Sequence, residues 1–266
     1  MKRGEFMNSL EGYSNSSYGV PNSYNPYNQY NPYYTYPWDQ WNKWNGYFDY
    51  GNTVYGQSGG CYCKKSYLRI LNTYEDTDFN VQINEIVMGE NLKTGQYTRY
   101  AQFSPGTYRV KICKSVEPEK LMFESVIAID QNLTYTGVIA ADEEDSSDIC
   151  MLMIPEAKEN AIAGKMSAVR LTNLISDAPD LELVASDGTV LLSGLGFGGV
   201  SCNLAIPSGR YELNLREKRS RKGVKTFKAD FAPRMHYTLF VTGKYGKEPI
   251  VKIIIPEDGV NYLELC

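Results

Sequence analysis

Tyr67-Leu-Arg-Ile-Leu-Asn72 and Ala168-Val-Arg-Leu-Thr-Asn173 are two versions of one β-type segment. Two further matches follow in the same order: Ser104-Pro-Gly-Thr-Tyr108 with Pro207-Ser-Gly-Arg-Tyr211, and Leu133-Thr-Tyr-Thr136 with His236-Tyr-Thr238. The offset stays at about 101–103 residues, and matches in one order at one offset are what an internal duplication produces. The chain therefore contains two copies of one small domain.

Period-two alternation predicts the fold of each copy. Apolar and polar residues alternate in 108–113 and again in 211–216, which is typical of a strand with one buried face and one wet face. Asp187-Gly188 between two β runs indicates a hairpin, and Tyr135 and Tyr237 stand at equivalent strand starts, where a tyrosine can bond the backbone. We expect an all-β chain with two tandem antiparallel immunoglobulin-like sandwiches of about seven strands each.

Composition divides the chain into four parts. Residues 1–65 form a tail rich in Tyr, Asn and Pro, 66–156 the first sandwich, 157–167 a linker and 168–266 the second sandwich. The tail has too few aliphatic residues to offset chain entropy, so we expect it to be disordered. Trp38, Trp41 and Trp44 lie at i, i+3 and i+6 within it. They form a candidate aromatic anchor; the alternatives are a segment that folds back on a domain, or plain low complexity.

The longest recognisable motifs lie in the second copy. Ala168 to Asp180, Leu192 to Gly198, Ile206 to Leu213 and Tyr237 to Val241 resemble the domain-of-unknown-function 4397 family. The resemblance extends over most of residues 67–260, although Tyr74 to Asp78 replaces the family's Ser-Pro-Asp-Ala-Pro segment in the first copy. It implies tandem domains on bacterial surface or secreted proteins. It supplies no catalytic residue.

Charge and hydropathy exclude several classes of protein. The net charge of −4 gives no basic footprint for nucleic acid. No apolar run reaches the ~18 residues that would suggest membrane insertion. The first ten residues carry positive charge without an apolar stretch behind it, so we expect no signal peptide and synthesis in the cytoplasm.

No motif predicts catalysis, a cofactor or a bound metal. Gly194 to Gly199 fits G-x-G-x-x-G, but a strand pattern follows where a nucleotide site needs a helix. His236, the only histidine, lies in a strand pattern, and Cys61-x-Cys63 offers only two of the four ligands that zinc takes. The acidic run 142–148 is expected to be a solvated loop or a weak cation site. The basic run 216–222 is expected to be a hairpin tip that stays soluble or pairs with an acidic neighbour.

The cysteines are the best candidates for chemistry. Cys61, Cys63 and Cys266 lie outside the predicted cores, and Cys113 shares the polar face of its strand, so all four are candidate cross-linking residues. Cys150 and Cys202 alternate with apolar residues, which predicts that they are buried. The alternative is that all the thiols are reduced and incidental.

These patterns favour a non-enzymatic structural protein of a bacterial surface layer, with a spore coat or exosporium as the best fit. Its partners would be further copies of itself or other layer proteins, and it would be deposited on the spore surface. The alternative hypothesis is a surface binding module that takes a carbohydrate or protein ligand. A third hypothesis, an enzyme, has no motif to support it.

Overall fold

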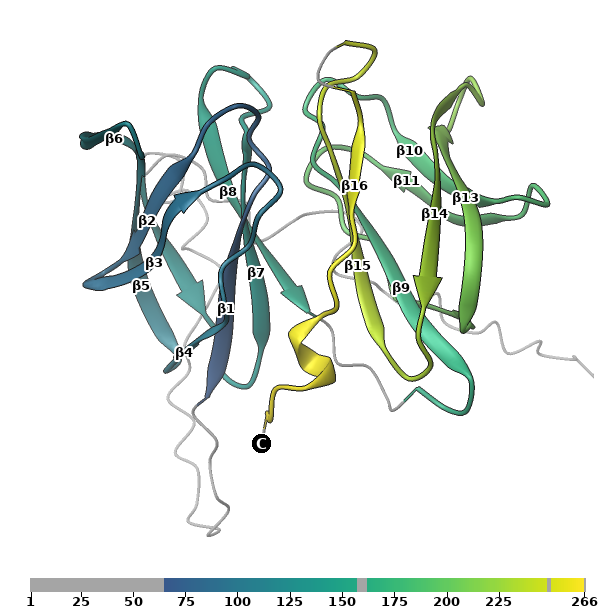
Figure 1. Cartoon of the computed structure of the whole chain (residues 1–266), viewed down its shortest axis with the longest axis horizontal. Helices are drawn as coiled ribbons and strands as arrows, with labels where there is room; N and C mark the ends of the chain where they lie inside the picture. Colours follow the sequence, from purple (N-terminus) through teal and green to yellow (C-terminus); the bar gives the residue numbers. More distant parts are fainter. Residues whose placement is uncertain (1–64, 157–161, 248–249, 266) are drawn as a thin grey trace, which may run out of the picture.

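The structure is a computed structural model that describes residues 65–156, 162–247 and 250–265. The candidate residues Trp38, Trp41, Trp44, Cys61, Cys63 and Cys266 lie outside the described residues. The two copies form two β-sandwiches that stand next to each other (Figure 1). The prediction of an all-β chain with two tandem sandwiches is therefore confirmed.

Each sandwich contains eight strands, one more than the sequence suggested. The first consists of β1 (Ser66–Asn72), β2 (Phe79–Ile83), β3 (Ile86–Leu92), β4 (Ala101–Phe103), β5 (Gly106–Lys114), β6 (Glu117–Ile129), β7 (Thr134–Ala141) and β8 (Ile149–Glu156). The second consists of β9 (Met166–Asn173), β10 (Leu181–Ala185), β11 (Val190–Leu195), β12 (Leu204–Pro207), β13 (Gly209–Glu217), β14 (Gly223–Phe231), β15 (His236–Thr242) and β16 (Lys252–Ile254). A short 3₁₀ turn, η1 (Gly259–Asn261), follows β16.

The two sandwiches have the same topology. The sheet orders β4-β1-β7-β8 and β3-β2-β5-β6 of the first recur as β12-β9-β15-β16 and β11-β10-β13-β14 in the second. One pairing in each copy is parallel, β1 with β7 and β9 with β15, within otherwise antiparallel sheets. Equivalent residues are in register, so that Arg69 lies beside Thr136 and Arg170 beside Thr238.

Local signals in the sequence account for the turns. Gly188 has φ +89° in the β10–β11 hairpin, and the Thr189 N–H donates to Asp187 Oδ1 at 2.9 Å. The rings of Tyr135 and Tyr237 are buried, and their hydroxyls accept backbone N–H bonds from the turns that precede β7 and β15, at 3.2 and 3.1 Å. Both tyrosines thus have the structural role that the sequence predicted.

The inner face of every sheet contributes to a core within its own sandwich. Phe79 and Ile112 are fully buried in the first core, and Leu183 and Phe231 in the second. On the outer sheets, β5 and β13 alternate between buried and exposed residues as expected.

A third apolar cluster joins the two sandwiches, and we call it the seam. It consists of Leu71, Val138, Ala140, Cys150, Leu152 and Ile154 from the first copy and Leu174, Val200 and Phe240 from the second. Figure 1 shows β7 and β8 in the middle of the molecule, facing β15 and β16. Because the central sheets are covered on both sides, every residue of β8 and β15 is buried. The molecule is therefore a stack of four sheets with three apolar layers between them.

Candidate functional site

Two arginines cross the seam beside its apolar cluster. Arg69 of β1 donates from Nε to the Thr136 hydroxyl at 2.9 Å and from Nη1 to the Glu257 carbonyl of the other copy at 3.1 Å. Arg170 makes the equivalent bonds from the second copy. It donates from Nε to the Thr238 hydroxyl at 2.8 Å and from Nη1 to the Pro155 carbonyl of the first copy at 2.5 Å. The same residue in each copy thus binds its own sandwich and reaches into the other.

Two carboxylates balance these charges. Arg69 Nη2 lies 3.4 Å from Glu156 Oε1, and Arg170 Nη2 lies 3.8 Å from Asp258 Oδ2. Glu156 also accepts bonds from the Tyr100 hydroxyl and from the Gly259 N–H, the latter at 2.6 Å. Burial and the nearby Asp258 raise the pKa of Glu156, and the Arg69 guanidinium opposes that shift. Burial and the Glu156 carboxylate raise the pKa of Tyr100, which keeps its hydroxyl a hydrogen-bond donor.

This group of two arginines and two carboxylates, which we call the clamp, is closed to solvent. No side chain in its two ion pairs is more than 4% exposed. A substrate would have no access to it, whereas breaking it would leave a charge buried without a partner. The clamp therefore acts as a structural joint between the copies. One signal for the clamp is present in the sequence, because an arginine between apolar residues occupies the same place in both repeats.

A third buried carboxylate, outside the clamp, lies on the outer sheet of the second sandwich. Glu182 of β10 accepts bonds from Arg216 Nε and Arg221 Nη1, each at 2.5 Å. Burial alone would raise the pKa of Glu182, but the two arginines outweigh it and hold the pKa below its ordinary value. Part of the basic run 216–222 is thus used to neutralise an acid of its own domain.

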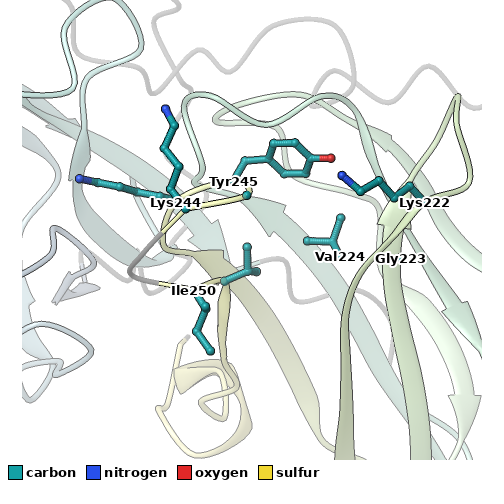
Figure 2. Close-up of a pocket in the computed structure, with 9 residues that line it drawn as sticks. Lys222, Gly223, Val224, Lys244, Tyr245 and Ile250 are labelled. Atoms are coloured by element: carbon teal, nitrogen blue, oxygen red, sulfur yellow. The ribbon is translucent and has the colours of Figure 1, made fainter.

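An open pocket of about 360 Å³ lies at one end of the second sandwich (Figure 2). Lys222 and Val224 approach it from β13–β14, and Lys244, Tyr245, Lys247 and Ile250 approach it from the β15–β16 connection. Figure 2 shows Lys222 and Tyr245 converging above Val224. The Lys222 ammonium lies 5.5 Å from the centre of the Tyr245 ring, and the Tyr245 hydroxyl donates to Glu217. Three lysines around a tyrosine and aliphatic side chains suit an anionic ligand.

The acidic run occupies the equivalent connection in the first copy. Residues 142–148 join β7 to β8, and Glu143, Glu144, Asp145 and Asp148 are exposed. Hydrogen bonds from Ser147 hold the pKa of Asp145 below its ordinary value, so this side chain is charged at neutral pH. The acidic loop and the lysine pocket lie at the same end of the molecule (Figure 1).

The three described cysteines differ in their exposure to solvent. Cys113 is half-buried, and Cys150 is buried with its Sγ 3.6 Å from the Ala141 carbonyl. The prediction that Cys202 is buried is wrong: Cys202 is exposed. Residues 201–203 form no strand, and β12 begins only at Leu204, so the alternation that seemed to point Cys202 inward does not apply.

The histidine and the glycine motif that the sequence offered for chemistry both lie in or next to β-strands. His236 lies on β15 with Nδ1 3.1 Å from Asn261 Oδ1, and its ring is buried. Gly194 and Gly198 have φ of +82° and +69° in and after β11, and no helix follows them. Among the described residues, no three His, Cys, Asp or Glu side chains group together as metal ligands. The described chain also has no helix with the length and apolarity needed to cross a membrane.

Comparison with known proteins gives weak structural likenesses. A family 26 carbohydrate-binding module from Eubacterium rectale Amy13K, solved with maltoheptaose, is 9% identical, with coverage of 71% of this chain and 95% of that chain and a TM-score of 0.24. The Bacillus anthracis TIE protein is 12% identical, with coverage of 69% and 34% and a TM-score of 0.23. TM-scores this low do not establish a shared fold. The bound maltoheptaose is a property of the carbohydrate-binding module alone.

The family comparison is decisive. None of the curated proteins compared with the chain matches it. The family described as Domain of unknown function (DUF4397) matches twice, at residues 66–183 and 167–259, so that each match begins at the first strand of a sandwich. Together the matches include more than half of the chain, and they agree with the two copies seen in the structure. The chain belongs to the DUF4397 family, as a tandem pair of its domains.

Proposed function

We propose that the chain is a non-enzymatic structural protein of a bacterial surface layer, with a spore coat or exosporium as the first candidate. The observation that carries the proposal is the seam with its clamp. Apolar side chains from both copies and two reciprocal arginines pack the two sandwiches against each other. We therefore treat them as one rigid block and not as two domains joined only by a linker. Rigid blocks that present fixed ends are suited to building a layer.

The use of ionisable groups supports the same proposal. In the clamp Arg69 pairs with Glu156 and Arg170 with Asp258, and on the outer sheet Glu182 pairs with two arginines. Groups of this kind serve catalysis only when they line an accessible cavity. Because these side chains are buried and paired with one another, they support a role in stabilising the fold.

Fractionation of the native source tests this proposal. Antibodies against the chain are used on vegetative cells, sporulating cells and purified spores, each separated into soluble and surface extracts. We expect the protein to accumulate during sporulation and to enter the surface extract. A protein that remains in the soluble fraction at all stages would rule the proposal out.

The cysteine hypothesis has its own test. In non-reducing gels of native material, serine at Cys61, Cys63 and Cys266 should remove the high-mass species that reducing agent also removes. Serine at the buried Cys150 is the matched control and should leave them in place. High-mass species that persist in the triple variant would show that these cysteines do not join the subunits.

A second candidate function is a carbohydrate-binding module. Tyr97 and Tyr262 are 50% and 58% exposed; the Tyr97 ring lies 5.2 Å from the Arg69 guanidinium of the clamp, and the Tyr262 ring packs edge-on against Tyr100 at 6.2 Å. Exposed aromatic rings offer apolar faces with polar rims, which suit sugars. A glycan array with the full chain and with Tyr97→Ala and Tyr262→Ala tests it: binding that both substitutions abolish supports this function, and an array without binding excludes it.

A further inference from the structure

The duplication places two equivalent loops at one end of the molecule. Residues 142–148 connect β7 to β8, and residues 243–251 connect β15 to β16. Contacts at this end involve both copies: the Tyr74 hydroxyl donates to the Ser147 carbonyl at 3.2 Å, and Lys252 of β16 pairs with Glu75 of the first copy at 3.1 Å. The described parts of the two loops therefore lie at one end of the molecule (Figure 1).

The equivalent loops carry opposite charge. The first presents Glu143, Glu144, Asp145 and Asp148, and the second presents Lys244 and Lys247, with Lys222 on the neighbouring β13–β14 hairpin. The described residues contain no ion pair between these two sets; Lys247 instead lies 3.6 Å from the exposed Asp177. One end of the molecule thus carries a negative half and a positive half.

We propose that this end binds a second copy of the chain, with the acidic loop of each molecule against the lysine pocket of the other. A two-fold axis perpendicular both to the strands and to the line joining the two loops brings the two ends together and places each acidic loop opposite a lysine pocket. The contact is self-complementary and occurs twice, so it closes as a dimer. This inference deepens the proposed function, since it names one contact through which the rigid blocks would assemble.

A second copy fits better than pairing within one molecule. Both loops lie at the same end of the molecule (Figure 1), and an opposed copy presents the complementary charges directly to each of them. The pocket also offers Val224 and Ile250, the latter 53% exposed, to the methylene groups of an incoming glutamate. Because exposed ion pairs are individually weak and are screened over about 8 Å at physiological salt, we expect a weak dimer that high salt dissociates.

Charge exchange between the loops provides a sharp test. One variant combines Glu143→Lys with Glu144→Lys, a second combines Lys244→Glu with Lys247→Glu, and a third carries all four changes. The third variant keeps the net charge of −4 and is the matched control for non-specific attraction. All are full-length chains, studied in reductant by sedimentation velocity at low and high salt, after circular dichroism has shown that their folds are unchanged.

The expected pattern is specific to the proposed contact. Each of the first two variants should dimerise at least about tenfold more weakly than the original chain, because like charges then face each other at both contacts. An equimolar mixture of the two should restore the dimer, and the four-fold variant should dimerise like the original chain. Sedimentation profiles that are the same for all the proteins would overturn the proposal.

One further arm separates a second copy from another acidic partner. Poly-glutamate is titrated into the original chain and into the Lys244→Glu, Lys247→Glu variant. If the lysines are needed for poly-glutamate binding but the mixture of variants forms no dimer, the pocket takes a different acidic chain and the proposal is wrong. An original chain that enters the surface layer but forms no dimer in solution would refute this contact and leave the proposed function intact.

Discussion

Phe240→Ala should uncouple the two sandwiches. The Phe240 side chain is fully buried in the seam. An aromatic side chain buries roughly 150–250 Å², which at about 25 cal/mol per Å² corresponds to roughly 4–6 kcal/mol. Truncations of this kind cost about 3–5 kcal/mol, because the cavity collapses only in part. We expect a loss of that size in the free energy of unfolding.

Phe231→Ala is the matched control. Phe231 is equally buried and in the same copy, but it lies in the core between β-sheets of the second sandwich. It should lose a similar amount of stability while leaving the seam intact. The two variants should therefore differ in which part of the molecule opens, not in how much stability they lose.

Urea denaturation and hydrogen exchange measured by mass spectrometry distinguish them. For Phe240→Ala we expect the single unfolding transition to split, and amide protection to fall in β7 and β8 of the other copy. For Phe231→Ala, protection in β7 and β8 under native conditions should be unchanged. If Phe240→Ala leaves these strands as well protected as the control does, the seam does not couple the copies and the argument for a rigid block fails.

Three further predictions concern the polar groups and the C-terminal turn. Arg69→Met should cost about 3–5 kcal/mol in urea denaturation, because it leaves a buried carboxylate unpaired, whereas Arg210→Met at an exposed pair should change little. Glu182→Gln should lower stability at pH 7. Since the folded pKa of Glu182 is depressed, its contribution is present above the ordinary pKa of 4.5 and is lost as pH falls through the folded pKa, so denaturation midpoints of the two proteins should converge as the pH is lowered from 4.5 through the folded pKa. Gly259→Ala should loosen the C-terminal turn, because its Cβ would lie 2.7 Å from the Tyr100 ring; Gly223→Ala, with open space around it, is the control, and hydrogen exchange of residues 255–265 is the measurement.

The architecture within each copy could be predicted from the sequence because its signals are local. Alternation in 108–113 and 211–216 identified strands with one wet face, and these became β5 and β13 of the outer sheets. Asp187-Gly188 identified the hairpin from turn chemistry. In each case the residues that determine the structure are close in sequence to the structure that they determine.

The seam could not be predicted in this way. Residues 149–154 are apolar without interruption, which shows that both faces of β8 are buried but does not show what covers the second face. The partner, β15, lies about 90 residues away in the other copy. The prediction for Cys202 is wrong for the opposite reason: the run around it alternates like a strand, but residues 201–203 form no strand.

The candidate site was visible to sequence analysis only as separate pieces. The acidic run and the basic run are each evident in the sequence. That they lie at the same end of the molecule follows from the way the copies pack. The sequence also could not divide the basic run into its two roles. Arg216 and Arg221 pair with the buried Glu182, while Lys222 faces the pocket.

The two copies differ most in the charges of their exposed loops, where a difference costs little folding free energy. Inside the seam, the arginine contacts are nearly symmetric, because any change there would leave a buried charge or donor without a partner. At the exposed loops water screens every charge, so the equivalent connections can carry opposite signs at little cost to folding. Symmetry in the buried joint keeps both loops on one surface, and asymmetry in the loops makes that surface complementary to a second copy of itself. The assembly property that we infer therefore depends on both: without the rigid joint the charges would have no fixed positions, and without their opposite signs the duplicated ends would repel.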